Sequence, residues 1–170
     1  PQSRVELIDW VMAEQGPRLV IMNTVQSAAV IADDIRKKYG REYVEHLSTA
    51  LTPEDRTKTI NIVKERLADP ADTNWVLVAT SCVEAGVNFS FRNGFRELAS
   101  VLSLLQSAGR VDRDGAYEDS KMWSFSMQDD KMLKQNPGIK VSAGLLEEYL
   151  RDGLEITPDL STRSIIDELH

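Results

Sequence analysis

The sequence predicts an α/β fold, a mostly parallel central sheet with helices on both faces. Residues 19–22 and 75–79 are short, wholly apolar runs, which are typical of strands buried on both faces of a parallel sheet. Elsewhere, apolar residues recur at helical spacing over segments of about a dozen residues. Strands that alternate with helices of this length favour parallel pairing, because the chain must return along the sheet between one strand and the next.

The first half of the chain predicts three helices and two strands in alternation. Residues 5–12 have helical spacing of Val5, Ile8 and Met12, and Gly16-Pro17 ends the pattern. The run 19–22 then predicts a buried strand. We expect a second helix over residues 28–39, a strand over 43–47, and a helix over 52–67. The last of these begins with an N-cap hydroxyl, a proline and two acidic residues, which together favour a helix N-terminus.

The second half begins with the most strand-like run of the chain. Residues 69–74 are polar and include a proline, so they predict a loop before that run. The elements expected from there on are strands over residues 75–79, 95–99 and 121–126, and helices over 100–109, 141–150 and 162–169. We expect one folded domain over residues 1–127, and a linker or helical extension over residues 128–170.

Composition restricts the classes of function. The 170 residues carry a net charge of −7, which argues against binding nucleic acid through bulk positive charge. Residues 116–170 hold 11 acidic and 6 basic side chains, so the acidity belongs mainly to the tail. One cysteine and two histidines argue against a zinc or histidine-rich metal centre, and no metal site is expected. A lone cysteine favours a reducing, cytoplasmic location. No apolar run approaches the ~20 residues of a membrane span.

The strongest chemical pattern is QSAGRVDR at residues 106–113. Arg110 and Arg113 lie three apart at an expected helix end, which would place them on roughly the same side of the helix. Each guanidinium offers a planar fork of donors that suits phosphate oxygens. Gly109 before them would let another surface approach closely. Alone, such an arginine pair is most often a solvated helix end.

Other segments give this pattern a context. The order of five segments along residues 18–115 resembles superfamily 2 helicases: VIMNT at 20–24, HLST at 46–49, TPEDR at 52–56, TSCVEAGVNF at 80–89 and QSAGRVDR at 106–113. The first, fourth and fifth resemble motifs IV, V and VI of that superfamily. HLST, VEAGV and the FRELA segment at 95–99 are most similar to the CRISPR-associated helicase–nuclease of type I systems. The resemblance implies the second RecA-like lobe of such an enzyme.

The resemblance implies roles at the nucleotide. Arg110 and Arg113 would be arginine fingers that reach ATP across a cleft between two lobes and stabilise charge on the γ-phosphate. Gln106, Gly86, Asn88 and Gly109 would be ATP-binding residues or lie near the ribose and the lobe interface. No phosphate-binding loop of the form G-x-x-x-x-G-K-[ST] occurs in the sequence. ATP and Mg²⁺ would therefore be bound mainly by a first lobe, and this fragment alone would be inactive.

A second set of residues is implied to contact the sugar–phosphate backbone of a single strand of DNA. These residues are Asn23, Thr24, Ser48, Thr49, Arg56 and Thr80. Hydroxyls and amides hold phosphates without a large positive patch, which reconciles an acidic domain with a role on nucleic acid. The implied partners are a first RecA-like lobe and a nuclease domain of the same parent protein, single-stranded DNA and an RNA-guided surveillance complex. We expect the chain to be cut from a longer protein.

Asn88 departs from the family pattern, which usually has aspartate at this position. An amide keeps the size and an acceptor but loses the charge. Either the coupling between nucleotide and lobe closure is weakened, or the amide is a tolerated variant. Two other functions stay open: a lobe of another superfamily 2 DNA or RNA helicase, and a degenerate lobe that serves as an interaction module.

Overall fold

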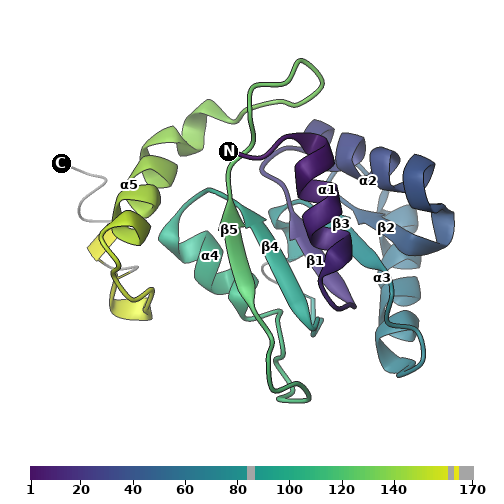
Figure 1. Ribbon diagram of the computed structural model, residues 1–170. Helices are drawn as coiled ribbons and strands as arrows, with labels where there is room; N and C mark the ends of the chain where they lie inside the picture. Colours follow the sequence, from purple (N-terminus) through teal and green to yellow (C-terminus); the bar gives the residue numbers. More distant parts are fainter. Residues whose placement is uncertain (84–86, 161–162, 165–170) are drawn as a thin grey trace.

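The computed structural model describes residues 1–83, 87–160 and 163–164, and the predicted α/β fold is confirmed (Figure 1). Its sheet has five strands in the order β2-β3-β1-β4-β5, and every neighbouring pair is parallel. The strands are β1 (Arg18–Ile21), β2 (Val44–Leu47), β3 (Val76–Ala79), β4 (Asn93–Glu97) and β5 (Met122–Phe125).

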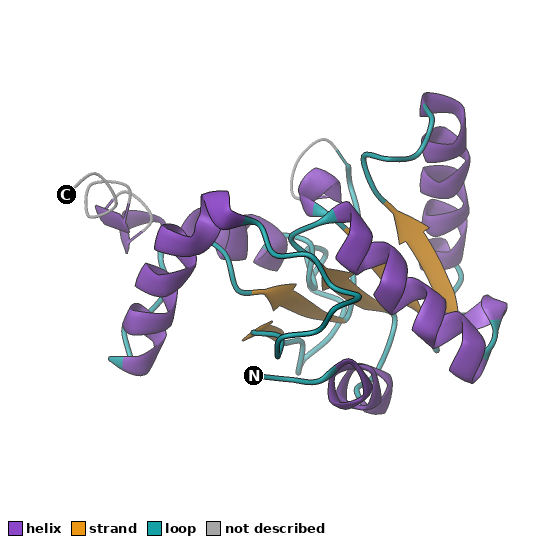
Figure 2. Ribbon diagram, turned by 90° about the horizontal axis from the view of Figure 1, so that it is seen from above, coloured by secondary structure: helices purple, strands orange, loops and turns teal. Residues whose placement is uncertain are grey.

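Helices lie on both faces of this sheet (Figure 2). They are α1 (Arg4–Ala13), α2 (Val25–Tyr39), α3 (Pro53–Ala68), α4 (Val101–Ala108) and α5 (Lys140–Arg151), with short 3₁₀ turns at Arg41–Tyr43, Ser81–Val83 and Pro137–Ile139. Helices α1 and α2 pack on one face, whereas α3 packs on the other and α4 covers β4 and β5. The result is the three-layer, RecA-like arrangement that the sequence predicts.

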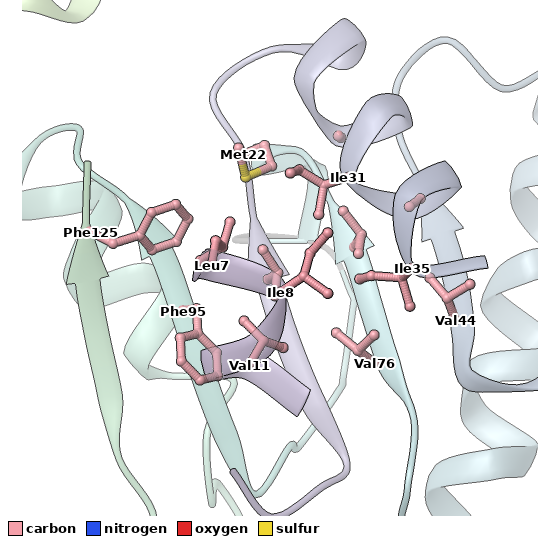
Figure 3. Close-up of a cluster of buried hydrophobic side chains, with 14 residues drawn as sticks. Leu7, Ile8, Val11, Met22, Ile31, Ile35, Val44, Val76, Phe95 and Phe125 are labelled. Atoms are coloured by element: carbon pink, nitrogen blue, oxygen red, sulfur yellow. The ribbon is translucent and has the colours of Figure 1, made fainter. Parts of the chain in front are cut away.

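The α1–α2 face holds the first of the two cores that sandwich the sheet. Leu7, Ile8 and Val11 of α1 form one buried cluster with residues of the central strands, among them Val20. Figure 3 shows Phe95 of β4 beside these α1 side chains. Each of these side chains is at most 4% exposed, so each contributes about 1.5–3 kcal/mol of burial free energy. The expected helix is therefore correct, but its buried face differs in detail, because Val5 points to solvent.

The other core lies under α3 and under the segment that links β3 to β4. Trp75, Phe89 and Phe91 are fully buried there, and the rings of Phe91 and Trp75 meet edge to face at 5.9 Å. Phe89 and Phe91 flank Ser90. Their two buried rings hold this part of the β3–β4 connection against the sheet. Val83 and Phe89, two residues of the TSCVEAGVNF segment, are buried in this core.

β4 begins two residues earlier than its apolar pattern indicates. The expected strand, residues 95–99, is observed as Asn93–Glu97. Gly94 pairs with Leu19 of β1 and Met122 of β5, and the side chains of Met122 and Val111 occupy the space where a Cβ would lie. A glycine in a strand often marks such a close approach. Ala99 falls beyond the strand, and Ser100 instead caps α4 by accepting from the backbone N–H of Ser103.

The C-terminal segment packs against the lobe. Leu146 and Tyr149 of α5 form a cluster with Val101 and Leu104 of α4. The expected helix over residues 141–150 is confirmed as α5, whereas most of the expected helix over 162–169 lies outside the described residues. The boundary at residue 127 stays a prediction. Along the described ranges of the chain, no helix is long and apolar enough to cross a membrane.

Candidate functional site

The candidate residues fall into two separate places. Asn23, Ser48 and Thr80 follow β1, β2 and β3, so their loops meet at the carboxyl edge of the sheet, where parallel sheets generally bind ligands. The arginine pair lies elsewhere. Val111 forms a parallel bridge with Phe91, two residues before β4 begins, so the arginine turn sits by the amino end of that strand.

The arginine turn, residues 109–113, starts where α4 stops. α4 ends at Ala108, and the N–H of the C-cap residue Gly109 donates to the carbonyl of Leu105. Arg110 and Arg113 are therefore not part of the helix, and the expectation that helical spacing aligns them is wrong. Asp112, with φ of 44°, turns the chain into the left-handed region between them. The helix cannot continue through this turn because backbone contacts with Phe91 hold residues 110–112 in a bridge.

Arg110 is tied to the motif V segment. Its Nε donates to the carbonyl of Val83 at 3.0 Å, so the QSAGRVDR and TSCVEAGVNF segments touch in the fold. Burial lowers the pKa of Arg110, and the positive charge of Arg113 lowers it further. The two positive charges thus repel each other. An anion that binds between two such groups offsets this repulsion.

The other nucleotide candidates lie on the surface near this turn. Gln106, Gly109, Asn88 and Arg113 are all exposed. A Cβ at position 109 would come no closer than 3.4 Å to its neighbours, which is ordinary contact. This chain alone therefore gives no packing reason for a glycine there. Gly86 lies outside the described residues.

The side-chain amide and the backbone N–H of Asn23 form hydrogen bonds within the chain. Its side-chain Nδ2 donates to the carbonyl of Leu98 at 2.9 Å, and its Oδ1 accepts from Arg96 at 2.6 Å. Its backbone N–H donates to the carboxylate of Glu97 at 2.7 Å. Burial raises the pKa of Glu97, against the opposing effects of the Asn23 N–H and Arg96. Asn23 thus fastens the end of β1 to the end of β4.

The hydroxyls at this edge divide into buried and exposed groups. Ser48 is fully buried and accepts from the N–H of Ala50, whereas Thr80 donates to Cys82 Sγ at 3.5 Å. Thr49 is exposed and Arg56, in the first turns of α3, is partly exposed. Whether these residues contact nucleic acid stays a prediction, but Thr49 and Arg56 are the ones that reach the surface.

Thr24 caps α2 and also contacts the C-terminal segment. Its hydroxyl accepts from the N–H of Ser27 and donates to the carbonyl of Lys134 at 3.0 Å. Glu97, Arg96 and Lys134 are therefore part of this edge, and sequence reasoning missed all three. FRELA marked the first two only as a family resemblance, and no local signal marks Lys134. Within the described ranges, no group of three His, Cys, Asp or Glu residues is placed to bind a metal ion.

Comparisons with curated proteins place these segments in a family context. The CRISPR-associated helicase Cas3 of Thermoproteus tenax is 26% identical over 155 residues, which are 91% of this chain and 26% of that protein. The CRISPR-associated nuclease/helicase Cas3 of Haloferax volcanii is 31% identical over 101 residues, which are 56% of this chain and 10% of that protein. The chain thus spans about a quarter or less of these relatives.

Solved structures agree on the fold. T. fusca Cas3 with ATP superposes with a TM-score of 0.69 at 18% identity, over 97% of this chain and 21% of that chain. The C-terminal domain of the DEAD-box protein Dbp5 superposes with a TM-score of 0.59 at 17% identity, over 91% of this chain and 81% of that domain. At these identities the likeness shows the RecA-like fold alone.

The family assignment covers the segments that build both candidate places. Residues 14–116, more than half of the chain, match the family described as CRISPR-associated nuclease/helicase Cas3, C-terminal. That range begins before β1 and ends after the arginine turn, so it includes both the carboxyl-edge loops and the contact of Arg110 with Val83. The chain belongs to this Cas3 C-terminal family and is a superfamily 2 helicase C-terminal lobe close to Cas3.

Proposed function

We propose that this chain is the second lobe of an ATP-driven translocase of single-stranded DNA that acts in CRISPR interference. The contact between Arg110 and the Val83 carbonyl carries the proposal, because it holds the Arg110 guanidinium in place three residues before Arg113, whose side chain is exposed. Two like charges held side by side favour the approach of a polyanion more than either does alone. The triphosphate of ATP, held by a first lobe, supplies that anion, and Arg110 and Arg113 stabilise the charge that develops on its γ-phosphate.

The exposed residues around the arginine turn form the surface that meets the first lobe. Gln106 and Asn88 offer amide groups to the nucleotide, and Gly109 allows the first lobe to approach closely. Gly86 belongs to the same proposed set. Mg²⁺ is bound with the triphosphate by the first lobe, so this lobe alone hydrolyses no ATP. T. fusca Cas3 structures with ATP, ADP and AMPPNP support nucleotide binding as a family property.

The DNA strand crosses the carboxyl edge of the sheet. Thr49 and Arg56 contact its phosphates directly because their side chains reach the surface. Asn23, Ser48 and Thr80 shape the loops that line the path, and Thr24 joins them at the start of α2. A nuclease domain of the same protein, and an RNA-guided surveillance complex in the cytoplasm, are the proposed partners. A structural relative from a CRISPR RNA-guided surveillance complex supports this context.

The first test is ATP hydrolysis by a protein that contains both lobes, with and without single-stranded DNA. Arg110→Ala and Arg113→Ala should each lower DNA-stimulated kcat by about 10³-fold or more, the usual contribution of an arginine finger. Arg36→Ala, on the exposed side of α2, is the matched control and should leave kcat unchanged. Full DNA-stimulated turnover by the Arg110→Ala, Arg113→Ala double variant would remove the arginines from the mechanism.

The second test addresses the strand path. Arg56→Ala should weaken binding of single-stranded DNA and lower the slope of log K against log salt by about 0.7, the value for one phosphate contact on a single strand. Lys64→Ala, an exposed residue farther along α3, is the control and should leave the slope unchanged. An unchanged slope for Arg56→Ala would show that the DNA strand does not bind at this part of the sheet edge.

A further inference from the structure

Each residue of the arginine turn has its own anchor in the fold. Arg110 is held through its side chain by the Val83 carbonyl. Val111 packs over Gly94, where a Cβ would come within 2.7 Å of Val111 Cγ2. Asp112 donates its backbone N–H to the carbonyl of Phe91 at 2.7 Å, and Phe91 in turn donates its N–H to the carbonyl of Arg110 at 2.7 Å. Backbone hydrogen bonds with Phe91 therefore hold the turn against the segment before β4.

Arg113 depends on Ser90. The hydroxyl of Ser90 accepts from the backbone N–H of Arg113 at 2.9 Å. Ser90 itself is fixed from both sides, because Phe89 and Phe91 are fully buried and their rings meet edge to face at 6.0 Å. Along an extended segment, alternate side chains point to opposite sides. Two buried phenylalanines thus direct the intervening hydroxyl outward to the arginine turn.

Asp112 supplies the change of direction. Among the described residues it is the only one other than glycine with positive φ, at 44°. Such a conformation is unfavourable for most L residues, although aspartate tolerates it better. Its carboxylate accepts from the N–H of Tyr117 at 3.0 Å, which holds the far side of the turn. Backbone strain beside two candidate catalytic groups is a reason to look for a positioning role.

We propose that Ser90 and Asp112 are positioning residues that set the direction of Arg113 relative to Arg110. The hydrogen bond to Ser90 fixes the position of the Arg113 backbone. The left-handed turn at Asp112 sets the direction in which the Arg113 side chain points. Neither residue touches the nucleotide. The inference rests on the proposed function, because it assigns a way of aligning the arginine pair that the function uses.

The experiment measures DNA-stimulated ATP hydrolysis in a protein that contains both lobes, together with the melting temperature of each variant. Ser90→Ala should lower kcat by about tenfold, since small misplacement of a catalytic group is costly, while KM for ATP and the melting temperature stay unchanged. Ser90→Thr retains a hydroxyl and should restore kcat. Ser142→Ala, at a partly buried serine on α5, is the matched control and should match the wild type.

The Asp112 variants test the backbone directly. Asp112→Gly retains easy access to positive φ and should keep most of kcat, whereas Asp112→Val disfavours the turn and should lose it. Wild-type kcat in Ser90→Ala, or equal activity of Asp112→Gly and Asp112→Val, would overturn the inference. If Arg113→Ala is also fully active, the proposed function fails with it. If Arg113→Ala is inactive while Ser90→Ala is normal, only the positioning role fails.

Discussion

Replacing Arg66 with alanine should destabilise the fold, because this one side chain holds several neighbours at once. The guanidinium of this α3 residue donates to both carboxylate oxygens of Asp72, at 2.8 and 3.1 Å, and to Glu45 at 3.1 Å. It also donates to the carbonyl of Glu42 and lies 4.5 Å from the ring centroid of the buried Trp75. One side chain thus joins α3, the edge strand β2 and the loop before β3.

The magnitude follows from how exposed these groups are. The side chain of Arg66 is 17% exposed, that of Glu45 is 23% exposed and that of Asp72 is 33% exposed. Solvent therefore screens the two ion pairs in part, and each contributes about 1 kcal/mol, the upper end for surface pairs. The contact with the Trp75 ring adds about 0.5–1 kcal/mol. The loss in free energy of unfolding is then about 3 kcal/mol, or about 6–12 °C in melting temperature for a chain of this size.

Urea and thermal unfolding of the 170-residue chain measure this loss. Arg66→Lys keeps the charge but not the planar fork, so it should fall between wild type and Arg66→Ala. Arg36→Ala is the control, since its pair with Asp33 is 3.4 Å long and about half exposed, and it should leave the free energy of unfolding nearly unchanged. An Arg66→Ala loss below about 1 kcal/mol, the value for a single surface pair, would refute the reasoning that one guanidinium ties these three elements together.

Three further perturbations follow from individual environments. Burial, and then the charge of Arg36, lowers the pKa of His46, so protonation favours unfolding. The free energy of unfolding should fall as pH drops below 6.5, and His46→Gln should flatten that dependence in unfolding measured between about pH 5 and 7. Gly16→Ala should lower the free energy of unfolding by about 2–3 kcal/mol, because the new Cβ would collide with the carbonyl of Thr73. Urea unfolding measures this loss. Phe95→Ala should lower the free energy of unfolding by about 3–5 kcal/mol and change the near-ultraviolet circular dichroism, because its buried ring contacts the rings of Trp10 and Trp123; an unchanged spectrum would contradict that packing.

The parts of the fold that could be predicted are those in which local pattern and burial coincide. β1 and β3 are buried on both faces, so their sequences are almost continuous apolar runs and need no long-range information. β4 could not be bounded in this way, because its first two residues, Asn93 and Gly94, are not apolar and Gly94 is required only by the approach of Met122 and Val111. That contact depends on residues far along the chain.

The candidate site divides along the same line. Residue types and spacing marked Arg110 and Arg113, but their departure from α4 depends on Phe91, which holds the turn by two backbone hydrogen bonds. The sequence indicated that Asn23 contacts a DNA strand, yet its side-chain amide forms hydrogen bonds with Arg96 and with the Leu98 carbonyl of its own chain. Sequence spacing does not reveal which polar groups a tertiary neighbour has already engaged.

The packing of α5 on α4 has a mechanical consequence. α4 has only eight residues, so it is a rod of about 12 Å, too short to bend appreciably. One of its sides holds Leu146 and Tyr149 of α5, and its end leads directly into Gly109 and the arginine turn. α4 therefore connects the arginine turn to α5 through a single short helix. If the turn binds phosphate as proposed, this helix would join that site directly to the segment that follows it in sequence.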